Sequence, residues 1–199
     1  MNRRALLIVV SAPSGAGKTT LCNRLLAEHD CMTRSISCTT RAPRGAELDG
    51  QHYHFLTLDE FNRRVSKGLF LEHAVVHGNH YGTLRSNVEA ALEAGKDVLL
   101  VIDVQGAAEV RRAAKSLGGT LNRSYVDIFI APPSLETLRD RLRKRGEDSP
   151  EVIESRLINA RDEMERGREY QYRVVNDNLE QAYAELNSII NTEHERTSC

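Results

Sequence analysis

Short apolar runs recur along this chain, separated by stretches in which apolar residues return every three or four positions. The pattern predicts strands at residues 5–10, 32–37, 97–103, 125–130 and 173–176. It predicts helices at residues 18–28, 85–94, 134–142, 150–164 and 179–190. Strands that alternate with helices are typical of a parallel sheet covered on both faces. The polar residues after Asn191 predict a frayed tail.

Residues 51–83 follow a different pattern. Thr57-Leu-Asp-Glu60 is a capping box, which predicts a short helix that ends near Gly68. Residues 69–77 predict a strand, and Gly78-Asn79 is typical of a hairpin turn. Because this mixed segment interrupts the regular strand–helix alternation, we interpret it as an inserted subdomain.

Length and charge narrow the class of protein. A chain of 199 residues fits one domain with an insertion. Its 27 basic and 28 acidic residues argue against nucleic-acid or membrane partners that are bound through bulk positive charge. No apolar run approaches the ~20 residues of a membrane span, and the apolar start is too short for a signal peptide. The four cysteines form no Cys-x-x-Cys pair, so we expect a reduced, cytoplasmic protein.

The strongest chemical signal is a glycine-rich turn at residues 11–20. It fits the phosphate-binding P-loop pattern G-x-x-x-x-G-K-[ST], except that Ala12 occupies the first position. A predicted strand precedes it and a predicted helix follows, as the motif requires. Backbone N–H groups of residues 14–19 would point at a triphosphate. Lys18 would neutralise phosphate oxygens, and Thr19 would hold Mg²⁺.

A second polar cluster contains two arginines, Arg41 and Arg44, three positions apart. Guanidinium groups bind phosphate oxygens with two parallel hydrogen bonds. Alone, this segment would equally fit a polar surface loop. Beside a P-loop it indicates a second anion site for an acceptor phosphate. Further hydroxyl donors near it are Ser37, Thr39, Thr40, Tyr53 and Tyr81.

Linked short motifs then follow in order along nearly the whole chain. They lie at residues 14–18, 36–44, 50–55, 70–72, 78–83, 102–106, 130–134, 141–146 and 175–177. In these motifs the sequence resembles the guanylate kinase family over residues 4–190. The resemblance implies an enzyme of purine nucleotide metabolism that transfers the γ-phosphate of ATP to GMP, giving ADP and GDP.

The resemblance also implies a three-layer α/β P-loop kinase fold with a parallel central sheet. Its core comprises residues 4–34, 84–138 and 168–190. A small mixed α+β insertion that binds GMP covers residues 35–83, and a helical lid covers residues 139–167. Residues 191–199 form the polar tail.

Site residues carried over from the family fall into groups that share a role. The ATP site comprises Ala12, Pro13, Ser14, Gly15, Ala16, Gly17, Lys18 and Thr19, with Asn176 near the base. The GMP phosphate is gripped by Arg41, Arg44, Tyr53 and Tyr81, and the guanine is surrounded by Ser37, Glu72, Thr83 and Asp103. The catalytic cations are Lys18, Arg44, Arg141, Arg145 and Arg156, and Mg²⁺ enters with ATP at Thr19. The partners are thus small molecules, with the oligomeric state left open.

Elementary chemistry supports two of these roles. An ionised Glu72 can only accept hydrogen bonds, and guanine offers two adjacent donors where adenine offers an acceptor. Glu72 facing solvent from a strand is an equally good interpretation from the sequence alone.

Residues 139–145 include five basic side chains, which usually means a solvated helix face. Phosphoryl transfer, however, needs cations that arrive on closure, and a hinge-like turn follows at residues 146–149.

One position departs from the family pattern. Val101 stands where the family usually has an acidic residue, which puts a lysine or metal contact there in doubt.

Two other functions compete with that of a GMP kinase. A kinase of the same fold with another acceptor, such as a ribose phosphate, is disfavoured by the predicted guanine-binding residues. A scaffold module that binds phosphopeptides is disfavoured by Lys18 and Thr19. The histidines at 52, 54, 73, 77 and 80 lack the convergent ligands of a zinc site.

Overall fold

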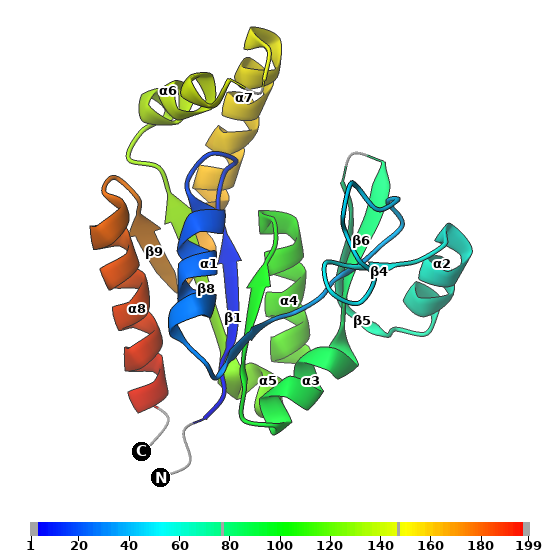
Figure 1. Cartoon of the computed structure of the whole chain (residues 1–199). Coiled ribbons are helices and arrows are strands. Elements are labelled where there is room, and N and C mark those ends of the chain that lie inside the picture. The colour runs from blue at the N-terminus through cyan, green and yellow to red at the C-terminus, as the bar shows by residue number, and fades with distance from the viewer. Residues whose placement is uncertain (1–3, 77, 147, 197–199) are drawn as a thin grey trace.

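Two sheets and the helices around them make up the structure, a computed structural model that describes residues 4–76, 78–146 and 148–196 (Figure 1). The larger sheet has five strands in the order β2-β7-β1-β8-β9, and every neighbouring pair is parallel. Its strands are β1 (Leu7–Ser11), β2 (Met32–Arg34), β7 (Asp97–Val101), β8 (Tyr125–Ala131) and β9 (Tyr172–Val175). The predicted parallel sheet is therefore confirmed.

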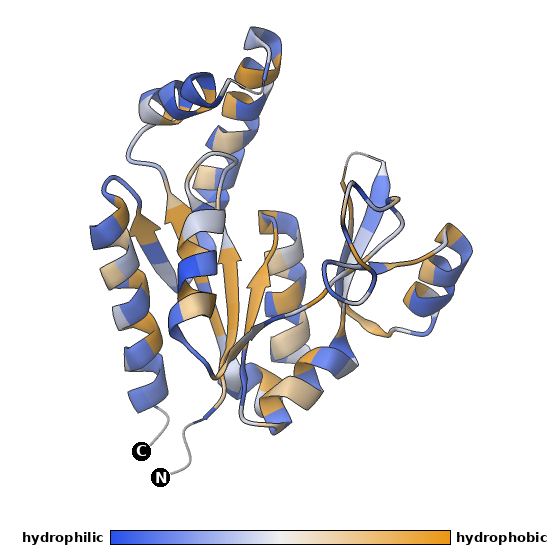
Figure 2. Cartoon of the chain, in the orientation of Figure 1, coloured by the Kyte–Doolittle hydropathy of each residue, from blue (hydrophilic) through white to orange (hydrophobic). Residues whose placement is uncertain are grey.

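Both faces of this sheet are buried, which explains why its strands are continuous apolar runs. Leu6, Ile8 and Val10 pack on one face with α1 and α8, whereas Leu7 and Val9 pack on the other with α3, α4 and α5. Figure 2 shows these apolar strands enclosed between helices. The helices are α1 (Lys18–Glu28), α3 (Arg85–Glu93), α4 (Val104–Leu117), α5 (Gly119–Ser124) and α8 (Leu179–Glu195). The result is the three-layer arrangement that the sequence predicted.

The predicted insertion folds as a separate four-stranded sheet in the order β4-β3-β6-β5. Its strands are β3 (Cys38–Thr39), β4 (His54–Phe55), β5 (Phe70–Val76) and β6 (Asn79–Leu84), and its helix is α2 (Leu58–Ser66). The Thr57 hydroxyl accepts a hydrogen bond from the backbone N–H of Glu60 at 3.2 Å, so the predicted cap is confirmed. His77, predicted to end the strand at residues 69–77, lies outside the described residues.

Two helices stand beyond the carboxyl ends of the five strands, above the P-loop in Figure 1. They are α6 (Leu135–Arg145) and α7 (Pro150–Arg166), capped by the hydroxyls of Ser134 and Ser149. Leu138 and Leu142 pack against Ile153 and Leu157 in a cluster distinct from the sheet core. A short 3₁₀ turn, η1 (Gly167–Glu169), connects α7 to β9. Glu147, in the predicted hinge-like turn, lies outside the described residues.

Several observed elements differ from the predicted ones. The strand predicted at residues 32–37 ends at Arg34, and strands β3, β4 and β6 of the insertion were not predicted. Helices α4 and α5 occupy residues for which the pattern predicted no element. The last helix continues past Ile190 to Glu195, where fraying was expected. The reason is that this end is anchored: His194 lies 3.2 Å from a carboxylate oxygen of the buried Asp97, and the Tyr172 hydroxyl donates to Glu193. Residues 197–199 of the predicted tail lie outside the described residues.

Candidate active site

The P-loop takes its shape from two glycines with left-handed backbone conformations. Strand β1 ends at Ser11 and helix α1 begins at Lys18, so the loop joins a strand directly to a helix N-terminus. Gly15 and Gly17 have φ angles of 88° and 92°, which favour glycine. A Cβ at Gly17 would lie 2.2 Å from the side-chain nitrogen of Asn176, so no larger residue fits there without a shift.

Asn176, which sequence reasoning assigned to the ATP base, lies against the P-loop backbone in this structure. It follows β9, is only 4% exposed, and donates from Nδ2 to the carbonyl oxygen of Ala16 at 2.8 Å. A buried amide with a satisfied hydrogen bond holds its partner in place. Asn176 therefore holds the P-loop backbone in place through Ala16, a role that its sequence position alone does not reveal.

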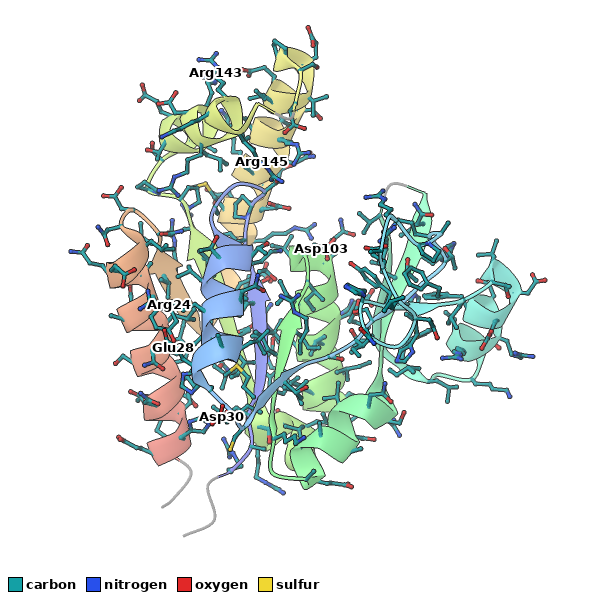
Figure 3. All side chains as sticks on the ribbon, in the orientation of Figure 1. Arg24, Glu28, Asp30, Asp103, Arg143 and Arg145 are labelled. Atoms are coloured by element: carbon teal, nitrogen blue, oxygen red, sulfur yellow. The ribbon has the colours of Figure 1, made fainter. Side chains whose placement is uncertain are left out.

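A pocket of about 600 Å³ opens above the P-loop, and we call it the P-loop pocket. Its volume lies in the range of small-molecule sites. Its lining combines the loop with charged side chains from three other elements: Ala12, Pro13, Ser14, Gly15, Gly17, Lys18, Thr19, Thr20, Asp103, Arg145 and Glu163. Figure 3 shows Arg145 between the α6–α7 pair and the P-loop, and Asp103 at the end of the sheet nearest that pocket.

Lys18 occupies the floor of the P-loop pocket. Its Nζ donates to the carbonyl oxygen of Ile102 at 3.5 Å, which directs the amino group across the ends of the strands. Burial lowers the pKa of Lys18, and the carboxylates of Glu163 and Asp103 act in the opposite direction. The two carboxylates therefore help to keep the lysine protonated.

A second pocket, of about 300 Å³, lies between the insertion and the large sheet, and we call it the Glu72 pocket. Its lining brings together five of the predicted GMP residues: Ser37, Tyr53, Glu72, Tyr81 and Asp103. The rings of Tyr53 and Tyr81 lie edge to face with their centroids 6.0 Å apart. Lys18 and Asp103 line both pockets, so the two spaces meet at these side chains.

Glu72 is a buried carboxylate, so the interpretation that it faces solvent is wrong. It lies on β5, is 5% exposed, and accepts a hydrogen bond from the Thr83 hydroxyl at 2.7 Å. Burial raises the pKa of Glu72 to about 7, although the Thr83 hydrogen bond acts in the opposite direction. The nearby carboxylates of Glu109 and Asp103 contribute to this increase in the pKa of Glu72. Glu72 is therefore poised to change charge near neutral pH.

Arg41 and Arg44 share a carboxylate that sequence reasoning missed. Both carboxylate oxygens of Glu47 accept from Nη2 of Arg41 at 2.9 Å, and one also accepts from the backbone N–H of Arg44 at 2.8 Å. The Arg41 guanidinium lies 5.4 Å from the ring centroid of Tyr53. The Arg44 side chain is exposed. Glu47 thus fixes Arg41 beside Tyr53, which lines the Glu72 pocket.

Three arginines from the α6–α7 pair extend toward the loops at the carboxyl ends of the strands. Arg156 donates from Nη1 to the Ser14 hydroxyl of the P-loop and from Nη2 to Asp148 at 3.0 Å. Arg141 donates to the carbonyl oxygen of Asp177 at 3.3 Å, and Arg145 lines the P-loop pocket. Arg143 lies on the outer side of α6 in Figure 3. Arg145 and Arg156 therefore lie at the P-loop, whereas Arg141 contacts the segment that follows β9.

A buried polar network fixes the point where the α6–α7 pair returns to the sheet. The carboxylate of Asp127, on β8, is fully buried and accepts from Arg111 Nη2 at 2.6 Å and from Arg111 Nε at 2.8 Å. It also accepts from the Tyr125 hydroxyl at 2.7 Å and from the backbone N–H of Gln171 at 2.8 Å. These bonds connect α4, β8 and the segment after η1.

Two negative findings concern the described part of the chain. It contains no group of three or more histidine, cysteine, aspartate or glutamate side chains able to hold a metal ion. None of its helices is long and apolar enough to cross a membrane.

Val101, where the resemblance implied an acid, is half-buried in the wall of the Glu72 pocket. Asp103 is the acidic residue that remains near the end of β7.

Comparison with known proteins gives concordant results. Residues 4–193 match the protein family described as guanylate kinase. The chain is 50% identical to a guanylate kinase of Paraburkholderia xenovorans over 184 residues, which is 92% of this chain and 78% of that protein. It is 49% identical to one of Alkalilimnicola ehrlichii, over 96% of this chain and 90% of that protein. The crystal structure of guanylate kinase from Anaplasma phagocytophilum is similar with a TM-score of 0.74 and 34% identity, covering 99% of this chain and 89% of that one.

Proposed function

The chain belongs to the guanylate kinase family, and we propose that its two joined pockets bind the two nucleotides of that family's reaction. The enzyme transfers the γ-phosphate of ATP to GMP, giving ADP and GDP, a step of purine nucleotide metabolism. ATP binds in the P-loop pocket and GMP in the Glu72 pocket. The observation that carries this assignment is that Lys18 and Asp103 line both pockets. The cytoplasm, where cysteines stay reduced, remains the predicted location.

On the ATP side, the backbone N–H groups at the start of α1 face the phosphates. Lys18 contributes a cation at the junction of the pockets. The oxygen donors of Thr19 and Asp103 beside this pocket suit Mg²⁺, which prefers hard oxygen ligands and is usually held jointly with substrate phosphates. When bound, the ion would neutralise charge on the phosphate oxygens. Asn176 holds the loop in its phosphate-binding shape.

On the GMP side, Glu72 accepts hydrogen bonds from the N1–H and N2–H₂ groups of guanine. Thr83 orients this carboxylate, and Ser37 and Asp103 line the same pocket. The acceptor phosphate lies toward the mouth, within reach of Arg41, Arg44, Tyr53 and Tyr81. Arg41 already has its guanidinium fixed by Glu47, so it needs little reordering to meet a phosphate.

Catalysis by these residues consists of positioning and charge neutralisation. The acceptor is already an anionic phosphate, so no strong general base is required. Lys18 and Arg44 approach from the core and the insertion, whereas Arg141, Arg145 and Arg156 approach from the α6–α7 pair. We infer that this pair acts as a lid, which closes over both nucleotides and excludes water.

Parallel turnover measurements test the assignment of the acceptor. The formation of ADP from ATP is followed with GMP, AMP, UMP, CMP and dTMP as acceptors. GMP should be preferred clearly, because only guanine presents two adjacent donors to Glu72. The variant Glu72→Gln should reduce the ratio of kcat/KM for GMP to that for AMP while leaving ATP binding unchanged. Equal or better turnover of AMP by the wild-type enzyme would contradict the proposed base pocket.

A further inference from the structure

Helix α7 presents a carboxylate, Glu163, to the P-loop pocket. Glu163 lies seven residues after Arg156, two helical turns, so both side chains project from the same face of α7. Arg156 contacts the P-loop through Ser14, and Glu163 lines the pocket beside Lys18 and Asp103. One face of α7 thus delivers both a cation and an anion to the phosphate site.

A carboxylate at this position is electrostatically unexpected. The P-loop is built to receive a triphosphate, and a second negative charge beside Asp103 repels that anion. The cations around the same pocket, Lys18 and Arg145 on its lining and Arg156 at Ser14, attract it. Glu163 is half-buried, so its charge is poorly screened by water. Burial raises the pKa of Glu163, and the nearby Lys18 acts in the opposite direction.

A divalent cation bound to the triphosphate changes the sign of this interaction. Mg²⁺ keeps several water molecules and is commonly held by one or two carboxylates together with substrate phosphates. Carboxylates accept hydrogen bonds from such waters. Asp103 and Glu163 lie on the same pocket as Thr19, the proposed metal ligand. With the ion bound, both carboxylates attract the complex of ATP and the cation, whereas they repel free ATP.

We propose that Glu163, together with Asp103, makes the P-loop pocket select ATP in its complex with a divalent cation over free ATP. This inference rests on the proposed ATP site and adds to it a residue that determines which form of the nucleotide is bound. Because Glu163 belongs to the lid helix α7, the lid carries part of this selectivity in addition to its arginines.

Calorimetric titration measures the selectivity directly, without turnover. The dissociation constant of ATP is determined with excess Mg²⁺ and again with a chelator, for the wild-type enzyme, Glu163→Gln and Glu165→Gln. Glu165 lies on the same helix but is exposed and pairs with Arg168, so it controls for loss of charge on α7. The preference of the wild type for Mg·ATP should fall about tenfold in Glu163→Gln, as expected for one missing charge near the ion. Glu165→Gln should leave it unchanged.

The alternative, that Glu163 merely holds Lys18 or α7 in place, predicts a different result. Both forms of ATP would then lose affinity by the same factor, and the preference would stay as in the wild type. That outcome would overturn the proposal, as would an unchanged affinity for both forms. Glu163→Asp keeps the charge and should keep the preference for Mg·ATP. A loss of that preference in Glu163→Asp would also contradict the proposal. If the wild type bound neither form of ATP, the proposed ATP site itself would fail.

Discussion

The charge of Glu72 should make the binding of GMP depend on pH in the neutral range. In the unliganded enzyme, burial raises the pKa of Glu72 to about 7. Only the ionised carboxylate can accept both guanine donors, so GMP binding must expel the proton wherever Glu72 is protonated. Lowering the pH therefore weakens GMP binding, whereas raising it beyond the pKa changes little.

The size of this effect follows from the titration of one group. With a pKa of about 7, the ionised fraction of Glu72 falls from roughly nine-tenths at pH 8 to roughly one-tenth at pH 6. The dissociation constant of GMP should therefore rise about tenfold over this range. The phosphate of GMP also titrates, near pH 6, and contributes a change of its own.

Two comparisons isolate the contribution of the carboxylate. Calorimetric titration of GMP between pH 6 and pH 8 is repeated with Glu72→Gln, which retains the shape and the phosphate site but cannot titrate. The pH dependence of the wild type minus that of the variant is the effect of Glu72. Guanosine, which has no phosphate, serves as a second ligand. If wild type and Glu72→Gln show the same pH dependence for both ligands, Glu72 does not meet the base as a carboxylate.

The same pKa has a consequence for stability. Because the folded-state pKa of Glu72 is above the usual glutamate value, its contribution favours folding below about pH 4.5 and is lost as the pH rises through about 7. In the unliganded enzyme, Glu72→Gln should therefore raise the free energy of unfolding more at pH 8 than at pH 5, by up to about 3 kcal/mol. Urea unfolding at the two pH values measures this difference, and an equal effect at both would refute it.

Three further predictions concern other parts of the molecule. Lys18→Met should lower kcat by about 100-fold or more, because it removes one preorganised cation. Thermal unfolding should change little, since Lys18 lies at a loop–helix junction. A near-normal kcat would exclude Lys18 from the site. Arg111→Leu should lower the free energy of urea unfolding by about 3–5 kcal/mol, since it leaves the fully buried Asp127 without its cation; an effect below 1 kcal/mol would mean that this pair contributes little. Fluorescent labels on exposed residues Asn62 of α2 and Lys144 of α6 should approach each other when ATP and GMP bind together, and an unchanged transfer efficiency would argue against lid closure.

The fold was largely predictable because its strands are buried on both faces. The run at residues 5–10 has no polar position, and a parallel sheet covered by helices is the arrangement that suits it. Helix α4 escaped prediction because its buried face is made mainly of small residues, Ala107 and Ala114 among them, which give little hydrophobic contrast. The end of α8 was missed because its order depends on the contact of His194 with Asp97, a residue 97 positions away.

The site residues show the same contrast: those in local motifs were predicted, and those whose role depends on contacts between distant segments were missed. The P-loop and the arginines of the insertion are local motifs whose spacing carries their chemistry. The charged partners Glu47, Asp148 and Glu163 were missed, because their roles arise only when separate elements are packed together. Asn176 belongs to a motif that was noticed, yet its hydrogen bond to Ala16 depends on how the last strand meets the first.

That hydrogen bond makes the maturation of the ATP site depend on the synthesis of β9. Asn176 stands 160 residues after Ala16, and it can donate to the P-loop only once β9 has paired with β8. A ribosome-bound chain therefore exposes its P-loop sequence early but lacks this support for roughly 10–30 s, at the usual rates of elongation. Contacts between such distant residues also form late and slow the folding reaction. Nascent chains that stop before β9 should consequently bind ATP poorly, and tight ATP binding marks a chain in which β9 has joined the sheet.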